Sequence, residues 1–133
     1  MQKELIIEIH GTGTHNRGAE LMAIAISERL RRSHSNCRIV VPMTFGDYRA
    51  RAGYEFFTTW EIQGPGRAFL TRTALKYGSA GARRALGVVD PMEIDVVLDA
   101  SGFAFSDQWG TVELRKLLDK MTRRRTGTPL ILL

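Results

Sequence analysis

Two short segments of the sequence combine glycines with polar side chains of the kinds that bind phosphates, carboxylates and sugar hydroxyls. The first segment, residues 10–18, reads His-Gly-Thr-Gly-Thr-His-Asn-Arg-Gly, and the second, residues 101–107, reads Ser-Gly-Phe-Ala-Phe-Ser-Asp. Glycines let backbone amides approach an anion closely, and arginine, asparagine and aspartate supply orienting hydrogen bonds. With an adjoining glutamate, the two segments supply the candidate substrate-binding residues: Gly11, Gly13, His15, Asn16, Arg17, Gly18, Glu20, Ser101, Gly102, Phe103 and Asp107.

The first segment, called the glycine loop below, matches neither of the two common phosphate-binding loops. A dinucleotide-binding G-x-G-x-x-G motif needs its third glycine two residues before Gly18, and it needs an acidic residue after the second strand, where residues 41–43 offer none. A P-loop needs a lysine after its last glycine, but Gly18 is followed by Ala19. Both motifs are therefore excluded on specific positions.

What remains is a loop that directs backbone amides and the positive end of a helix at an anion. Arg17 would then clamp a phosphate or carboxylate, and Asn16 would bind sugar hydroxyls. An equally weighted interpretation is a tight turn whose polar residues cap the helix, with Glu20 ion-paired to Arg17 one helical turn away.

Other polar residues give weaker chemical signals. His10 and His15 have no acidic or cysteine partner at metal-ligand spacing, so we predict no metal and no cofactor, and His10 is expected to bond a backbone carbonyl. Ser101 lacks the G-x-S-x-G context of a serine hydrolase. Asp107 is either a helix cap or an acceptor for sugar hydroxyls, and the aromatic residues around Phe103 form either a sugar-stacking wall or core. No residue pattern in the sequence identifies a catalytic group.

Hydrophobic periodicity predicts the elements that position these segments. Continuous apolar runs indicate strands at 4–9, 37–41 and 94–99, and apolar residues at three- and four-residue steps indicate helices at 19–32 and 114–121. Less regular patterns suggest a strand at 54–62, a helix at 67–86 and a strand at 129–133. The alternation predicts an α/β fold with a Rossmann-like, doubly wound, mostly parallel sheet in one domain over residues 1–133.

This fold makes two spatial predictions. The strands at 5–9, 38–41 and 95–98 should be adjacent and central, because their apolar character requires cover on both faces. The glycine loop and residues 101–107 should meet at one end of the sheet and form a shared cleft, because both follow parallel strands.

The chain carries a net charge of +5, concentrated in arginine clusters. We favour solvated arginines at helix C-termini, where cations complement the helix dipole, over nucleic acid, because no aromatic residues interleave with them. Contact with an anionic membrane surface stays open. The single cysteine, Cys37, is interpreted as a reduced thiol, and neither a signal peptide nor a membrane-spanning run is found. These features predict a cytoplasmic protein, with the inner face of the membrane as an alternative location.

Two motifs resemble those of polysaccharide pyruvyl transferases. A strand followed by Gly-Thr-Gly-Thr-His-Asn-Arg-Gly-Ala-Glu-Leu-Met-Ala, residues 11–23, is similar to the family's opening motif. Residues 95–110, Asp-Val-Val-Leu-Asp-Ala-Ser-Gly-Phe-Ala-Phe-Ser-Asp-Gln-Trp-Gly, resemble its second motif, and residues 128–133 resemble a later strand. Two positions depart from the pattern: Ala19 stands where the family usually has aspartate, and Ala100-Ser101-Gly102 replaces a richer glycine run.

The resemblance implies the N-terminal half of a glycosyltransferase-B-like arrangement of two Rossmann-like halves. It implies transfer of a pyruvyl group from phosphoenolpyruvate to a sugar acceptor, which is part of a polysaccharide or of a lipid-linked precursor. Two rival hypotheses stay open, namely a nucleotide-sugar enzyme of the glycosyltransferase kind and a non-catalytic interaction fragment.

The last four residues, Leu-Ile-Leu-Leu at 130–133, predict a buried strand without a following helix to cover it. We therefore expect a fragment of a longer domain that self-associates or hides this edge in a partner. Because a ketal-forming site needs donor and acceptor pockets held together, we also expect no turnover of phosphoenolpyruvate by the isolated chain.

Overall fold

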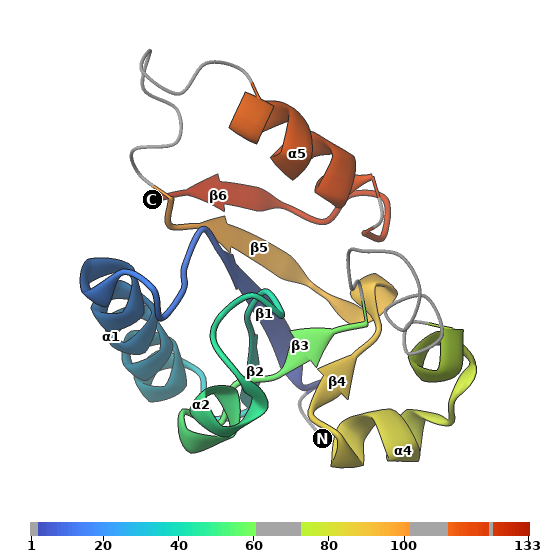
Figure 1. The fold of residues 1–133 in the computed structure, drawn as a ribbon. Coiled ribbons are helices and arrows are strands. Elements are labelled where there is room, and N and C mark those ends of the chain that lie inside the picture. The colour runs from blue at the N-terminus through green and yellow to red at the C-terminus, as the bar shows by residue number, and fades with distance from the viewer. Residues whose placement is uncertain (1–2, 61–72, 102–111, 123) are drawn as a thin grey trace.

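The computed structural model describes residues 3–60, 73–101, 112–122 and 124–133, in which helices alternate with parallel strands (Figure 1). Residues 73–77 form a short helical segment. The labelled elements in chain order are β1 (Leu5–His10), α1 (Arg17–Ser33), β2 (Cys37–Val40), α2 (Tyr48–Gly53), β3 (Thr58–Thr59), α4 (Ala80–Ala85), β4 (Val88–Val89), the 3-10 turn η1 (Pro91–Glu93), β5 (Val96–Asp99), α5 (Val112–Met121) and β6 (Leu130–Leu132).

The main sheet has four strands in the order β2-β1-β5-β6, and all three pairings are parallel. The predicted adjacency of the strands at 5–9, 38–41 and 95–98 is confirmed, but of the three only β1 and β5 are central in this sheet, since β2 is its end strand among the described residues. A second parallel pair, β3 and β4, is linked to β2 by a bridge between Val40 and Phe57. The protein thus has a mixed α/β fold with a four-stranded parallel sheet, consistent with the predicted Rossmann-like arrangement.

Helices cover both faces of the sheet, as its apolar strands require. Successive side chains of a strand point to opposite faces. Ile7 and Ile9 pack with Ala23 of α1, whereas Ile6 packs with Val97 in a separate cluster that includes Met121 of α5. The side chains of residues 6, 8 and 10 of β1 therefore share the face covered by α5.

The strand predicted at 54–62 is shorter than expected, and its first part is not a strand. Tyr54 is the C-terminal cap of α2, and Glu55 follows with a positive φ of 55°. Phe56 then turns into the core, where its ring meets that of Phe45 edge-on at 5.3 Å. The alternation of polar and aromatic residues reflects this aromatic cluster, and only Thr58–Thr59 form β3. Residues 61–62 lie outside the description.

The single helix predicted at 67–86 is wrong over its described part. Helical residues 73–77 end before Gly78, and Ser79 has an extended backbone and starts α4. The Ser79 side chain accepts a hydrogen bond from the Ala82 amide at 3.1 Å, which makes it an N-cap. Neither α2 nor β4 was anticipated from the sequence.

β6 lies at the edge of the sheet among the described residues, next to β5 (Figure 1). Ile131, Leu132 and Leu133 are exposed there, as is Leu118 of α5. The predicted strand at 129–133 is confirmed for Leu130–Leu132, and the self-association expected from this apolar edge stays a prediction.

Candidate functional site

The glycine loop and the end of β5 meet at one end of the sheet. His10 lies opposite Asp99 in the parallel register of β1 and β5. The strand order reverses between these two strands, since the chain runs from β1 to β2 on one side and returns to β5 on the other. Ligands of open α/β sheets bind beyond the carboxyl ends of strands at such a reversal.

Gly11 marks the close contact between the two loops. Its φ is +76°, and a Cβ atom at this position would lie 2.5 Å from the Cβ of Ser101 and 2.6 Å from the Ser101 amide nitrogen. Only glycine adopts this positive φ readily and has no Cβ atom to collide with Ser101. The predicted meeting of the two loops is thus confirmed as far as Ser101, and the shared cleft stays a prediction. The other second-loop candidates lie outside the described residues: Gly102, Phe103 and Asp107.

A buried carboxylate joins the ends of β1 and β5. Asp99 is only 1% exposed, and its Oδ2 lies 3.0 Å from Nδ1 of His10. Its Oδ1 accepts hydrogen bonds from the Ser101 amide, at 2.8 Å, and from the Ser101 hydroxyl. Burial by itself raises the pKa of Asp99, but the hydrogen bonds from His10 and Ser101 outweigh burial and hold the pKa below its usual value.

This arrangement is not that of a serine nucleophile. In a serine hydrolase the imidazole stands between the carboxylate and the hydroxyl. Here Asp99 stands in the middle, and the Ser101 hydroxyl donates to the carboxylate instead of to the imidazole. The group available for chemistry is therefore the imidazole of His10, which contradicts the expectation that His10 bonds a backbone carbonyl through its ring.

At the first turn of α1, the polar residues of the glycine loop cap the helix, as the second of the two interpretations predicts. The Asn16 side chain accepts hydrogen bonds from the Gly18 amide at 2.9 Å and from the Ala19 amide at 3.3 Å. Arg17 donates to Glu20 at 2.9 Å, which confirms the predicted intrahelical ion pair. The helix amides that sequence analysis assigned to an anion are thus occupied by the Asn16 carboxamide.

Glu20 also reaches across to α2. Its Oε1 accepts a hydrogen bond from the Tyr54 hydroxyl at 2.8 Å. The Tyr54 hydrogen bond, followed by that from Arg17, lowers the pKa of Glu20, and the same bond raises the pKa of Tyr54. Glu20 therefore acts as a link between α1 and the end of α2.

The middle of the glycine loop is closely packed. A Cβ at Gly13 would lie 2.6 Å from Cε1 of His15, so the exposed His15 ring lies back over the loop. The Thr12 side chain is buried, and its hydroxyl has no hydrogen-bond partner among the described residues. A buried hydroxyl without a partner, two residues after His10, is a polar feature that the fold alone does not explain.

A second buried carboxylate, Glu8, lies two residues before His10 on the same face of the sheet. Arg124 donates to Glu8 through Nε at 3.0 Å and Nη2 at 2.8 Å, and Lys120 also contacts the carboxylate. Burial raises the pKa of Glu8, but the charges of Lys120 and Arg124 outweigh burial and lower it. Arg124 is itself buried, so the prediction that its cluster is solvated is wrong for this residue.

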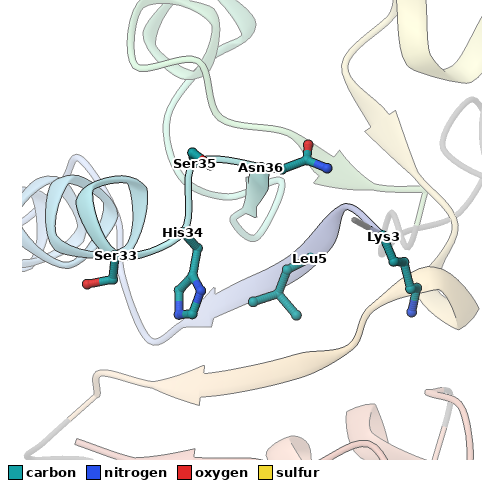
Figure 2. A pocket seen from close by; sticks show the side chains of 6 residues that line it. All are labelled: Lys3, Leu5, Ser33, His34, Ser35 and Asn36. Atoms are coloured by element: carbon teal, nitrogen blue, oxygen red, sulfur yellow. The ribbon is translucent and has the colours of Figure 1, made fainter. Parts of the chain in front are cut away.

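A separate shallow pocket of about 270 Å³ lies at the opposite end of the sheet (Figure 2). It is formed by residues at the end of α1 and the starts of β1 and β2: Lys3, Leu5, Ser33, His34, Ser35 and Asn36. Figure 2 shows His34 and Lys3 on either side of Leu5. Because the amino ends of the strands lie here, this pocket is separate from the site at His10.

Neither Asp99 nor the role of His10 follows from the sequence. Asp99 is the last residue of an apolar strand, and no motif joins it to a histidine 89 residues earlier. A usable signal was present, since Glu8 and His10 are polar residues at alternate positions of an otherwise apolar strand. Polar side chains on the covered face of a central strand need hydrogen-bond or ion-pair partners inside the protein.

The fold and site together define a parallel α/β protein with an aspartate-oriented histidine at the point where the strand order reverses. Among the described residues, no group of three or more histidine, cysteine, aspartate or glutamate side chains is placed to hold a metal ion. Within the same residues, no helix is long and apolar enough to cross a membrane. Searches against protein-family models, curated proteins and solved structures found no match.

Proposed function

We propose that this chain is the acceptor- and anion-binding half of a polysaccharide pyruvyl transferase. In this proposal it is the doubly wound N-terminal half of a glycosyltransferase-B-like protein. The protein transfers a pyruvyl group from phosphoenolpyruvate to a sugar of a cell-surface polysaccharide or its lipid-linked precursor. The supporting observation is the pair of His10 and Asp99 at the strand reversal, next to the loop that carries the family-like motif.

The reaction needs a proton acceptor near the sugar. In ketal formation two hydroxyl oxygens of the sugar bond to C2 of phosphoenolpyruvate, a proton adds to C3, and the bond from C2 to the phosphate oxygen breaks. Of the two protons that the sugar gives up, one ends on C3 and the other on the released phosphate. The balance therefore requires groups that take protons from hydroxyls and deliver one to carbon.

The described residues supply the acceptor side of this chemistry. Thr12, with its unpartnered hydroxyl, lies two residues after the partly exposed His10, and Ser101 lies against Gly11. Hydroxyls and a ring nitrogen are groups that bind sugar hydroxyls. The side chain of Arg17 is 84% exposed beyond its bond to Glu20, so it is accessible to a phosphate or carboxylate.

The test incubates the full-length protein with phosphoenolpyruvate and a panel of glycan acceptors, and in parallel with nucleotide sugars. Phosphate release that depends on the acceptor, with a pyruvyl ketal detected by mass spectrometry, supports the proposal. Release of a nucleoside diphosphate in place of phosphate would favour a glycosyltransferase. Absence of both reactions would favour an interaction role.

A further inference from the structure

We propose that His10 is the general base that takes the proton from the acceptor hydroxyl, and that Asp99 is its positioning residue. The inference rests on the proposed function for the identity of the acceptor. The observation that supports it is the contact between His10 and Asp99 at the ends of β1 and β5, which does not depend on the identity of the donor.

The contact with Asp99 determines which ring nitrogen carries the proton. An ionised carboxylate only accepts hydrogen bonds, so the His10 nitrogen that faces it, Nδ1, must be the donor. In the neutral imidazole the other nitrogen, Nε2, is then a bare acceptor. The lowered pKa of Asp99 is consistent with a carboxylate that stays ionised beside the ring.

Asp99 is itself held in place. Its Oδ1 accepts from the Ser101 amide and hydroxyl, which leaves Oδ2 directed at His10. Because the carboxylate is buried, water competes little with these bonds, and hydrogen bonds in such surroundings are stronger than in solvent. The carboxylate thus fixes both the orientation and the protonation of the imidazole.

The imidazole remains open to a ligand. The His10 side chain is 24% exposed, in contrast to 1% for Asp99, and Nε2 has no hydrogen-bond partner among the described residues. Within the same part of the chain, neither of the other two histidines, His15 and His34, contacts a carboxylate. A bare ring nitrogen such as Nε2 can accept a hydrogen bond from a ligand hydroxyl.

The proton transfer balances within the proposed reaction. As the second sugar oxygen bonds to C2 of the donor, the bond from C2 to the phosphate oxygen breaks, the O–H bond of the sugar breaks, and the proton passes to Nε2. The positive charge of the imidazolium is balanced by the adjacent Asp99 carboxylate. The ring returns to its neutral form by giving the proton to the departing phosphate.

The first experiment reads the tautomer directly. Two-bond proton–nitrogen correlation spectra of the ¹⁵N-labelled 133-residue chain, at an alkaline pH where imidazoles are neutral, show which nitrogen is protonated. We expect His10 to be protonated on Nδ1 alone, and to remain so in S101A, which keeps the carboxylate. A His10 ring protonated on Nε2 would overturn the inference, because Nε2 would then be a donor.

The second experiment measures catalysis in the assay described above. H10A should lower kcat by about 10²- to 10⁴-fold, the range of general-base catalysis, with a much smaller change in KM. Added imidazole should restore part of kcat in H10A. H34A is the matched control, because His34 is an exposed histidine at the opposite end of the sheet, and it should leave kcat unchanged.

The two proposals fail in distinguishable ways. Pyruvyl transfer that survives H10A would overturn the role of His10 and leave the proposed function intact. Absence of pyruvyl transfer, together with a His10 ring protonated on Nδ1, would overturn the proposed function, and the base would then serve another hydroxyl acceptor. S101A and H10A decide the role of His10 without a variant of the buried Asp99.

Discussion

Two buried carboxylates lie close together on the face of the sheet covered by α5, and they have opposite kinds of partner. Glu8 in β1 contacts the cations Lys120 and Arg124, whereas Asp99 in β5 contacts an imidazole and a hydroxyl. Each is 1% exposed, and each has its pKa lowered by its partners despite burial. Burial and charge alone therefore do not distinguish them.

The difference lies in what the partners can do near neutral pH. Lysine and arginine keep their charge there, so the Glu8 cluster is a permanent ion network that connects β1 to the end of α5. The imidazole of His10 has a second ring nitrogen that can accept a proton, so the Asp99 cluster can exchange a proton with a ligand. We infer that Glu8 stabilises the fold and that Asp99 orients His10 in the candidate site.

Removing the charge of Glu8 should have the largest effect on stability. E8Q deprives Lys120 and the buried Arg124 of their carboxylate, and loss of one member of a buried ion pair costs about 3–5 kcal/mol. Urea denaturation at neutral pH measures this change. The control is E28Q, which affects an exposed pair with Arg32 and should cost about 0.5 kcal/mol or less. Equal costs for the two variants would refute the structural role of Glu8.

Substituting Gly11 tests whether the two loops must touch. G11A places a Cβ within 2.7 Å of three Ser101 atoms at a φ of +76°, so we expect a loss on the order of 3 kcal/mol from strain and overpacking. G53A is the matched control, because a Cβ at Gly53 meets no atom within 4 Å. If thermal unfolding shows G11A to be as stable as G53A, the close contact is not required.

Asp99 should matter less for stability than Glu8, and it should contribute to the acid sensitivity of the fold. D99N should cost about 1–3 kcal/mol at neutral pH, the range for a mispaired buried polar group. Folding lowers the pKa of Asp99, so the stability contributed by the ionised group is fully present above the unfolded-state value of about 3.9. It is lost as the pH falls through the lower folded-state pKa.

The fall in the free energy of unfolding at acidic pH therefore tests whether the folded state lowers the pKa of Asp99. Urea titrations from neutral to acidic pH should show a shallower fall in stability for D99N than for the unmodified chain. A D99N curve parallel to that of the unmodified chain below about pH 4 would show that Asp99 is not the group responsible.

The smallest expected effect concerns the cap that ends the glycine loop. N16A removes the acceptor for the Gly18 and Ala19 amides and should cost about 1 kcal/mol. N16D keeps an acceptor and adds a charge that favours a helix N-terminus, so it should restore the stability. Equal thermal midpoints for N16A and N16D would show that capping by Asn16 contributes little.

Local hydrophobic patterns were sufficient to predict an element where the pattern is regular along its whole length. The apolar runs at 5–9, 38–41 and 95–98 predicted the three adjacent parallel strands, and the apolar steps at 19–32 predicted α1 within two residues. They failed at 54–62, where alternation came from an aromatic cluster, and at 67–86, where a glycine–serine pair interrupts the helix. At 54–62 the contact with Phe45, outside the segment, outweighed the periodicity, whereas at 67–86 the Ser79 cap inside the segment begins a new helix.

For the candidate site, the sequence by itself determined the glycine loop, the Arg17–Glu20 pair and the position of both loops after parallel strands. These features depend on residues close together along the chain or on the rule that parallel strands end at the same edge. Only the tertiary structure decided that Asn16 caps α1, that Glu8 meets Arg124, and that His10 meets Asp99. The last two pairs join residues 116 and 89 positions apart, and the register of β1 and β5 and the packing of the α5 segment bring them together.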